Sequence, residues 1–281
     1  MKDGPDYILA SREGLYIVNH KRWRRVADGY FFGVTVKGSD IYCFKTVARP
    51  DALADGNSGS IVRYKYRDGE LTGPELLVSG LDHNCHQVDF FDGAFFVVDT
   101  HNQRILEFDK QWQIAKSHQL LPPAISDGPD YAHLNSFLGV DDSIYIMFHN
   151  KSRGLTSEII EFDRGFRERR RLVLGSAGCH DIVRLEDGHL LYCESFKGCL
   201  ARDDGLAFAV DDLYTRGLAV GEDEIAVGSS SFGRRVARVL LPGFVTFLDR
   251  AYQRIARLYV PAAPTQIRRL DGADLSLSRP H

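Results

Sequence analysis

Short alternating runs of hydrophobic and polar residues, separated by turn residues, fill most of this chain. Within 85–112, three apolar-rich segments are divided by turns and cover 86–91, 94–99 and 104–108. Asp92-Gly93, between the first two, is a strong signal for a two-residue hairpin. A further turn precedes Trp112, where we expect a fourth strand to open. The pattern therefore predicts a four-stranded antiparallel sheet.

The same unit recurs at a regular period. Three histidines, His86, His133 and His180, each begin an apolar segment, and successive members of the set are 47 residues apart. Arg216 takes the same place in a later segment. An Asp followed three residues later by an aromatic also recurs, in the pairs Asp109 and Trp112, Asp163 and Phe166, and Asp249 and Tyr252. A four-stranded repeat of about 40–50 residues predicts a β-propeller, and 281 residues hold about six such units.

The sixth unit is divided between the two ends of the chain. Residues 265–270 have the pattern of an inner strand with no second strand after it. The missing partners are found at 7–11, 14–18 and 24–27. Pairing the two ends buries sheet edges that would otherwise be open. We therefore expect a single all-β domain over 1–281, a six-bladed β-propeller of four-stranded antiparallel blades whose last blade is closed by N- and C-terminal strands.

One blade carries a family resemblance. Residues 97–109, Val-Val-Asp-Thr-His-Asn-Gln-Arg-Ile-Leu-Glu-Phe-Asp, resemble an NHL repeat, whose blades have an Asp, an Asn, an Arg-Ile pair and a Phe-Asp at this spacing. The resemblance implies an NHL-like six-bladed propeller. Such propellers include peptide-amidating lyases, gluconolactonase-like hydrolases, strictosidine synthase-like enzymes and plain binding modules, so the fold does not choose a function.

Composition narrows the function classes. A net charge of −3 argues against a nucleic-acid partner. No apolar stretch reaches membrane-spanning length, and residues 1–6 lack the regions of a signal peptide, so we expect a cytoplasmic protein without a membrane partner. The five cysteines include no Cys-x-x-Cys pair and do not suggest disulfides. We expect a monomer or a small homo-oligomer, with a rim loop at 48–60.

The regularly spaced histidines are the candidate chemistry. The innermost strands of a propeller line its central channel, so His86, His133 and His180 should face the axis at one height. Three imidazoles with one open position suit a divalent transition metal, zinc or iron. The alternative is an inherited repeat feature in which each ring bonds the backbone of a neighbouring blade. His101, His149 and Glu194 end the second strands of the same blades, and we expect them to bind substrate.

Residues close to the three histidines in the predicted fold complete the candidate site. Arg216 should orient an anionic group, and Asp181 or Tyr214 should move protons. Peptide-amidating lyases resemble this pattern in holding zinc with three channel histidines and placing an Asp next to one of them, as in His180-Asp181. Gluconolactonase-like hydrolases use acidic and Asn ligands, which do not match.

Three interpretations stay open. The first is a metal-dependent lyase or hydrolase acting on a small anionic substrate. The second is a non-haem iron oxygenase that uses the same histidines. The third is a non-catalytic NHL-like propeller that binds a peptide or protein.

Overall fold

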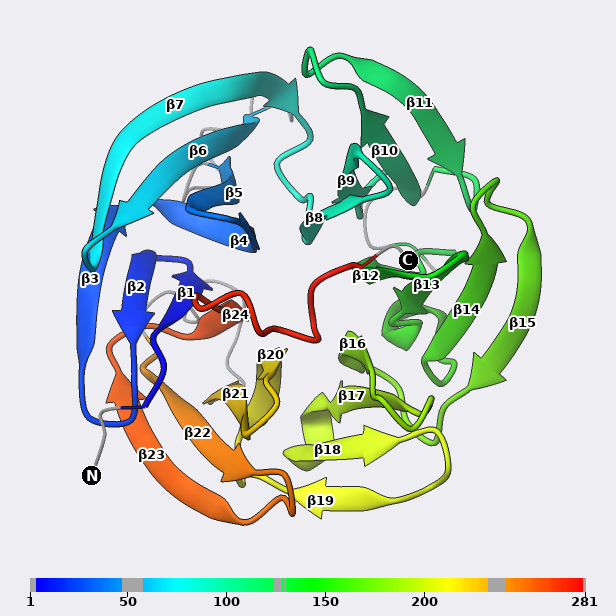
Figure 1. Cartoon of the computed structure of the whole chain (residues 1–281). Helices are drawn as coiled ribbons and strands as arrows, with labels where there is room; N and C mark the ends of the chain where they lie inside the picture. The colour runs from blue at the N-terminus through cyan, green and yellow to red at the C-terminus, as the bar shows by residue number, and fades with distance from the viewer. Residues whose placement is uncertain (1–3, 47–57, 124–127, 129, 232–240, 280–281) are drawn as a thin grey trace.

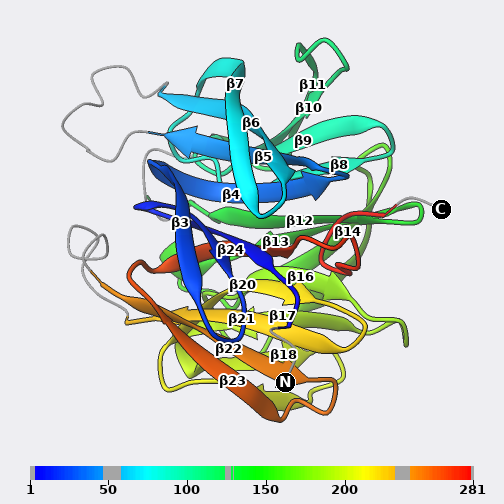
Figure 2. The same cartoon turned by 60° about the vertical axis from the view of Figure 1, so that its left-hand side comes forward.

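The chain forms a closed ring of six four-stranded antiparallel sheets around a central channel (Figure 1). The computed structural model describes residues 4–46, 58–123, 128, 130–231 and 241–279. Figure 2, turned from the first view, shows the sheets stacked around the ring as blades. The predicted NHL-like, all-β, six-bladed propeller is confirmed.

Each blade runs outward from an innermost strand at the channel to an outermost strand at the rim. Blade 1 consists of β24 (Pro264–Arg269), β1 (Tyr7–Ser11), β2 (Gly14–Val18) and β3 (Trp23–Asp28). Blade 2 consists of β4 (Tyr30–Lys37), β5 (Asp40–Thr46), β6 (Gly59–Arg67) and β7 (Glu70–Leu81). Blade 3 consists of β8 (Val88–Phe91), β9 (Ala94–Asp99), β10 (Arg104–Phe108) and β11 (Ile114–Gln119).

The remaining three blades follow the same order. Blade 4 consists of β12 (Leu134–Val140), β13 (Ser143–Phe148), β14 (Glu158–Asp163) and β15 (Glu168–Val173). Blade 5 consists of β16 (His180–Arg184), β17 (Leu190–Glu194), β18 (Cys199–Arg202) and β19 (Ala207–Ala209). Blade 6 consists of β20 (Tyr214–Val220), β21 (Glu224–Ser230), β22 (Gly243–Asp249) and β23 (Arg254–Val260).

Helical structure is minimal. The described residues contain the 3-10 turns η2 (Lys151–Arg153) and η3 (Ser195–Lys197), and none of their helices is long and apolar enough to cross a membrane. Most of the predicted insertion at 48–60 lies outside the described residues.

The split blade closes as the sequence predicts. Inner strand β24 pairs antiparallel with β1, with Leu9 opposite Ile267 and Tyr7 opposite Arg269. Leu9, Ile267 and Tyr7 are all fully buried. Strand addition across the two chain ends therefore satisfies backbone groups that an open ring would leave exposed.

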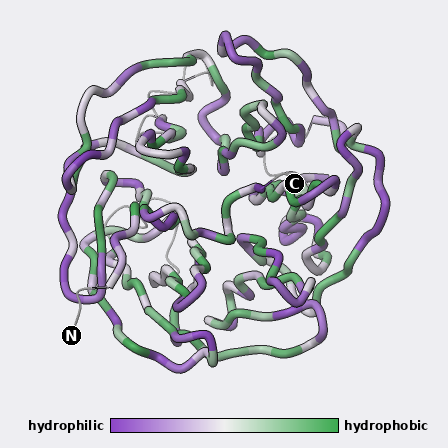
Figure 3. Tube along the Cα trace, viewed as in Figure 1, coloured by the Kyte–Doolittle hydropathy of each residue, from purple (hydrophilic) through white to green (hydrophobic). Residues whose placement is uncertain are grey.

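Hydrophobic packing lies between the blades. Each of the six core clusters draws its members from two neighbouring blades. Between blades 3 and 4, for example, Phe96 and Phe137 stack with ring centroids 5.0 Å apart. Figure 3 shows hydrophobic residues along the inner strands and more hydrophilic ones along the rim, where outermost strands such as β15 are largely exposed. A blade thus buries its faces only against its neighbours.

The repeated Asp turn has a clear local cause. In blade 3, one carboxylate oxygen of Asp109 accepts hydrogen bonds from the backbone nitrogens of Gln111 and Gln113, each at 2.9 Å. Asp163 and Asp249 accept the equivalent pairs of bonds. The aromatic residue in each turn has a left-handed backbone, with φ of 61° at Trp112. The expectation that Trp112 opens the outer strand is wrong, because this left-handed residue ends the turn and β11 starts two residues later.

The turn aromatics join neighbouring blades. Trp112 stacks on Tyr42 of blade 2 with ring centroids 5.7 Å apart. Phe166 stacks on His118 of blade 3, and Tyr252 on Phe208 of blade 5, at 3.8 and 3.5 Å. The three positions are equivalent, as predicted. They connect their blades to the preceding ones. Trp112 and Phe166 also pack within their own blades, on Phe95 at 5.1 Å and on Phe162 at 6.2 Å.

A segment after β24 crosses the channel at the far ends of the inner strands (Figure 1). The backbone nitrogen of Leu275 donates to Val220 of blade 6, and that of Arg279 donates to Gly139 of blade 4. The backbone nitrogen of Ser278 donates to a carboxylate oxygen of Asp89 in blade 3, at 2.7 Å. Residues 270–279, called the sealing segment below, therefore cover one end of the channel. The sequence predicted only a turn here.

Candidate functional site at the channel mouth

Four imidazoles form a continuous arc at the end of the channel opposite the sealing segment. The ring centroids of neighbouring members are 4.7 Å apart for His86 and His133, 4.8 Å for His133 and His149, and 5.1 Å for His149 and His180. The three histidines predicted as metal ligands are thus brought into one sector. His149, predicted to bind substrate, lies between two of them. We call these four residues the imidazole arc.

Irregular backbone at the starts of the inner strands accompanies this arrangement. His133 has a left-handed backbone with φ of 55°, and a β-bulge follows it between Leu134 and Ser136. Asp181 has φ of 59° within a bulge between His180 and Val183. Bulges of this kind re-aim side chains at the ends of strands. Equal spacing in the sequence could not show these local departures from regular pairing.

Backbone contacts fix the orientation of two rings. Nδ1 of His86 lies 2.9 Å from the carbonyl oxygen of Asn84, and Nδ1 of His180 lies 3.2 Å from that of Gly178. In each ring, Nδ1 also lies near a hydroxyl, that of Thr100 at 2.8 Å from His86 and that of Ser195 at 3.0 Å from His180. In the tautomer with the proton on Nδ1, this nitrogen donates to the carbonyl oxygen. Nε2 is then the nitrogen with the lone pair.

Burial favours the neutral form of three of the four imidazoles. Burial lowers the pKa of His86, His133 and His180 well below the usual value. The positive charge of Arg216 lowers all three pKa values further. A neutral imidazole is the form that accepts a proton or binds a metal.

The arc has the donor atoms of a metal site but lacks its geometry. Neutral imidazoles with anchored Nδ1 atoms are the donors that zinc and iron accept. However, within the described parts of the chain no group of three His, Cys, Asp or Glu side chains is arranged to hold an ion. The rings follow one another in a row, with His149 between His133 and His180. The donor chemistry fits a metal, and the arrangement as it stands does not.

Arg216 and Tyr214 lie at the two ends of the arc. The Tyr214 hydroxyl is 3.2 Å from Nδ1 of His180. The Arg216 guanidinium carbon lies 5.9 Å from the centroid of the Phe32 ring, and Phe32 stacks on His86 at 5.0 Å. Both side chains predicted to handle substrate therefore lie beside imidazoles.

Asp181 faces a neighbouring blade. One carboxylate oxygen accepts a hydrogen bond of 2.9 Å from the backbone nitrogen of Gly217 in blade 6. Burial raises the pKa of this carboxyl. Gln87 makes similar contacts with blade 4, since its side chain both donates to and accepts from the backbone of Phe137. These bonds hold blades together, and a catalytic role of Asp181 stays a prediction.

Two predicted substrate-binding residues lie apart from the arc. Glu194 accepts hydrogen bonds from Ser176 and from Lys197, the latter at 2.7 Å. His101 lies near Asp82, whose pKa is raised by burial and lowered in part by the neighbouring imidazoles. Neither residue lines the channel cavity. Their roles in binding substrate stay predictions.

Two adjoining cavities lie at the mouth. The inner one, with a volume of about 10 Å³, is lined by His86 and His180 of the arc together with Arg216, Asp181 and Thr265. The second lies between blades 6 and 1 and also includes Arg216 and Thr265. Arg12 lines this second cavity and was not identified from the sequence. It lies between β1 and β2, in the same inter-strand connection that provides His149 in blade 4. Its position near the mouth could therefore have been predicted from the repeat.

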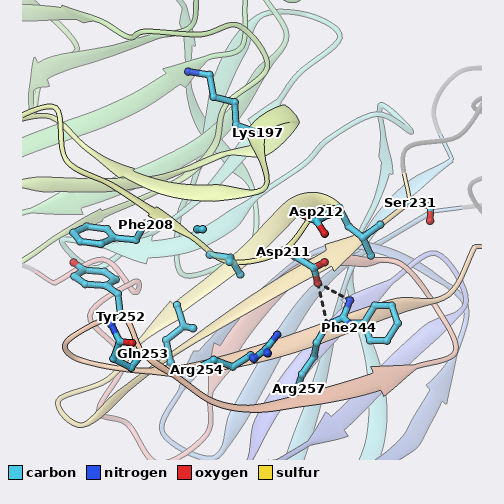
Figure 4. A pocket seen from close by; sticks show the side chains of 14 residues that line it. Lys197, Phe208, Asp211, Asp212, Ser231, Phe244, Tyr252, Gln253, Arg254 and Arg257 are labelled. Carbon is cyan, nitrogen blue, oxygen red and sulfur yellow. Dashed lines mark hydrogen bonds and ion pairs between the residues drawn. The ribbon is translucent and has the colours of Figure 1, made fainter.

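A larger groove lies away from this site, at the rim between blades 5 and 6 (Figure 4). Its volume is about 990 Å³. The stacked pair Phe208 and Tyr252 lies at one side. At the other side, Arg257 lies 3.6 Å from the Phe244 ring centroid and pairs with Asp211 at 2.8 Å. None of the described residues that line the groove is a histidine, so it is separate from the arc.

Comparison with known proteins supports the fold alone. No family model matches the chain, and no curated protein sequence matches it. Nidogen, from the crystal structure of a nidogen/laminin complex, has a TM-score of 0.69 at 11% identity, over 95% of this chain and 98% of that one. A protein of unknown function from Bacteroides caccae has a TM-score of 0.61 at 12% identity, over 95% and 100%. A streptogramin B lyase has a TM-score of 0.57 at 14% identity, over 96% and 89%.

Proposed function

We propose that the channel mouth binds a small anionic molecule and catalyses a lyase- or hydrolase-type reaction on it. The observation that carries this proposal is the arc of four imidazoles, two of them buried, next to Arg216. Neutral imidazoles are general bases near physiological pH, and a guanidinium binds carboxylate or phosphate with two parallel hydrogen bonds. The similarity of this fold to a streptogramin B lyase is consistent with lyase chemistry on such a scaffold.

The residues have distinct roles in this proposal. Arg216 binds the anionic group and orients the substrate over the arc. The lone pair on Nε2 of His86 or His180 accepts a proton from a substrate carbon or from an attacking water. Tyr214, whose hydroxyl contacts His180, returns a proton to the leaving group. Burial of His86 and His180 favours their neutral forms and limits their contact with bulk water.

A bound zinc or iron ion would be held by His86, His133 and His180. It would polarise a substrate oxygen or activate water, and iron would support the oxygenase alternative. Because these side chains do not converge as they stand, no step above depends on a metal. Metal content of protein purified without an affinity tag tests this point directly. Stoichiometric metal, lost in His86→Ala, His133→Ala and His180→Ala but kept in Arg216→Ala, would establish the ion.

The catalytic proposal is tested by turnover. A panel of small carboxylates and phosphate esters is incubated with the wild type, His86→Gln, His180→Gln and the control His189→Gln, whose imidazole is 40% exposed and pairs with Asp203 at the periphery. We expect turnover that is lost in the first two variants and kept in the control. Turnover that survives both arc substitutions would refute the role of the imidazoles.

The rim groove favours a second candidate, a non-catalytic propeller that binds a peptide or protein. Its aromatic pair and the Arg257–Phe244 contact offer side chains that are common in protein interfaces. The nidogen structure similar to this fold is a complex with laminin. An inactive wild type that binds a partner, with binding lost in Phe244→Ala, would favour this function over the first.

A further inference from the structure

Two arginines from different blades approach one aromatic ring. The guanidinium carbon of Arg12 lies 5.4 Å from the Phe32 ring centroid and 5.5 Å from that of Tyr30. The guanidinium carbon of Arg216 lies 5.9 Å from the same Phe32 ring. Contact with an aromatic face supports a planar guanidinium without using all of its hydrogen-bond donors. Blades 1 and 6 thus present positive charge on a shared support.

Both arginines line the same cavity between blades 6 and 1. Tyr214, Ser230 and Thr265, which carry hydroxyl groups, also line it. None of the described residues in its lining is acidic. Guanidinium and hydroxyl donors without a carboxylate among the lining side chains are the chemistry that recognises oxyanions.

The cavity adjoins the imidazole arc. It shares Arg216 and Thr265 with the inner channel cavity, where His86 and His180 lie. A ligand whose charged end lies beside the two arginines would therefore point its other end toward the arc.

We propose that Arg12 and Arg216 form a subsite for a doubly charged oxyanion, so that the substrate carries a phosphate monoester or two neighbouring carboxylates at one end. The assignment of this ligand as substrate rests on the proposed function, whereas the binding of the oxyanion does not. Two guanidinium groups can each engage one pair of oxygens, which a single carboxylate cannot satisfy. The subsite thereby selects against monoanions.

The test is calorimetric titration at low salt with inorganic phosphate, malonate and acetate as probes. Wild-type protein should bind phosphate or malonate with 1:1 stoichiometry and at least about tenfold more tightly than acetate. Arg12→Gln and Arg216→Gln should each weaken the dianion by about tenfold to a hundredfold, as expected for lost charge-assisted hydrogen bonds. The control Arg167→Gln removes the same charge from the exposed rim and should leave the affinity unchanged.

The outcomes separate this proposal from the catalytic one. Equal affinity for acetate and the dianions, no binding at all, or equal losses in Arg167→Gln and Arg12→Gln would overturn the subsite. Preference for phosphate over malonate, or the reverse, identifies which oxyanion the subsite takes. If dianion binding depends on both arginines but no turnover is found, the subsite stands and the catalytic proposal fails. Thermal melts of each variant confirm that the fold is retained.

Discussion

The two ends of the channel are built from the same six inner strands and differ in what fills them. At the mouth, the starts of the strands present imidazoles, an aromatic ring and two guanidinium groups to adjoining cavities. At the other end, the sealing segment uses backbone hydrogen bonds to cover the strand ends. The difference indicates that one end contributes chemistry and the other contributes closure. Each prediction below tests whether the two ends are separable in this way.

The largest effect is expected from truncation at the sealed end. Deleting residues 264–281 removes β24 as well as the sealing segment, and exposes the edge of β1. We expect an insoluble or unfolded product, because two neighbouring blades lose their packing partner. Expression, gel filtration and circular dichroism measure this outcome.

A shorter deletion is the matched control. Removing residues 272–281 leaves β24 paired with β1 and takes away only most of the sealing segment. We expect a folded, less stable protein that still binds oxyanions at the mouth. If the longer truncation is soluble, monomeric and as heat-stable as the full chain, closure by strand pairing is refuted.

Lowering the pH should destabilise the folded protein through the histidines at the channel mouth. His86, His133 and His180 have folded-state pKa values well below the unfolded value of about 6.5, so the unfolded chain binds more protons. Stability is therefore complete above about pH 6.5 and is lost as the pH falls below it. With three such groups, the unfolding free energy falls by up to about 4 kcal/mol for each pH unit of acidification.

The measurement is urea unfolding of metal-free protein between pH 7.5 and about pH 5.5. His133→Gln should remove about one third of the slope, since it removes one of the three titrating rings. Asp181 and Asp274 have raised pKa values in the folded protein, so the folded state binds more protons than the unfolded chain at these two groups. In more acidic solution they therefore increase the unfolding free energy as the pH falls. Burial of neutral rings would be contradicted if the unfolding free energy did not change with pH below about 6.5. It would also be contradicted if His133→Gln had the same pH dependence as the wild type.

A smaller effect is expected from one side chain of the sealed end. Asp274 is buried and accepts hydrogen bonds from the backbone nitrogens of Arg269 and Ser276, at 2.7 and 2.8 Å. Asp274→Ala leaves these donors without their acceptor and should cost about 2–3 kcal/mol of unfolding free energy. Asp92→Ala, which breaks an exposed ion pair with Arg164, should cost less than about 1 kcal/mol. Weaker phosphate binding in Asp274→Ala would show that the ends are coupled.

Periodicity made most of the fold predictable. The equal spacing of His86, His133 and His180 defined three blades, and the unpaired pattern at 265–270 predicted the split one. Strands β9 and β10 have the predicted bounds. The Asp99-Asn102-Arg104 part of the NHL-like motif proved to be a buried hydrogen-bonded unit of the blade 3 turn. A repeated pattern predicts well because each repeat must bury the same faces.

The site was less predictable, because its details depend on contacts between repeats. His149 could be placed near the arc from its position after a second strand, but its insertion between His133 and His180 needed the three-dimensional arrangement. Arg12 belongs to the blade assembled from both chain ends, where the repeat is hardest to align. The sealing segment contains a short alternation, Leu275-Ser276-Leu277-Ser278, but its path across the channel depends on contacts with blades 3, 4 and 6 that this pattern does not specify.

Because the sealing segment covers one end of the channel, the mouth at the imidazole arc is its open end. Any small molecule that enters at the imidazole arc must leave by the same opening, since the far end is covered by backbone of the chain itself. A product that keeps the anionic group of its substrate would then compete for the two arginines before it departs. Under the proposed function, the ligand at the mouth would therefore be a free small molecule or the exposed end of a chain, and not a polymer that threads through the ring.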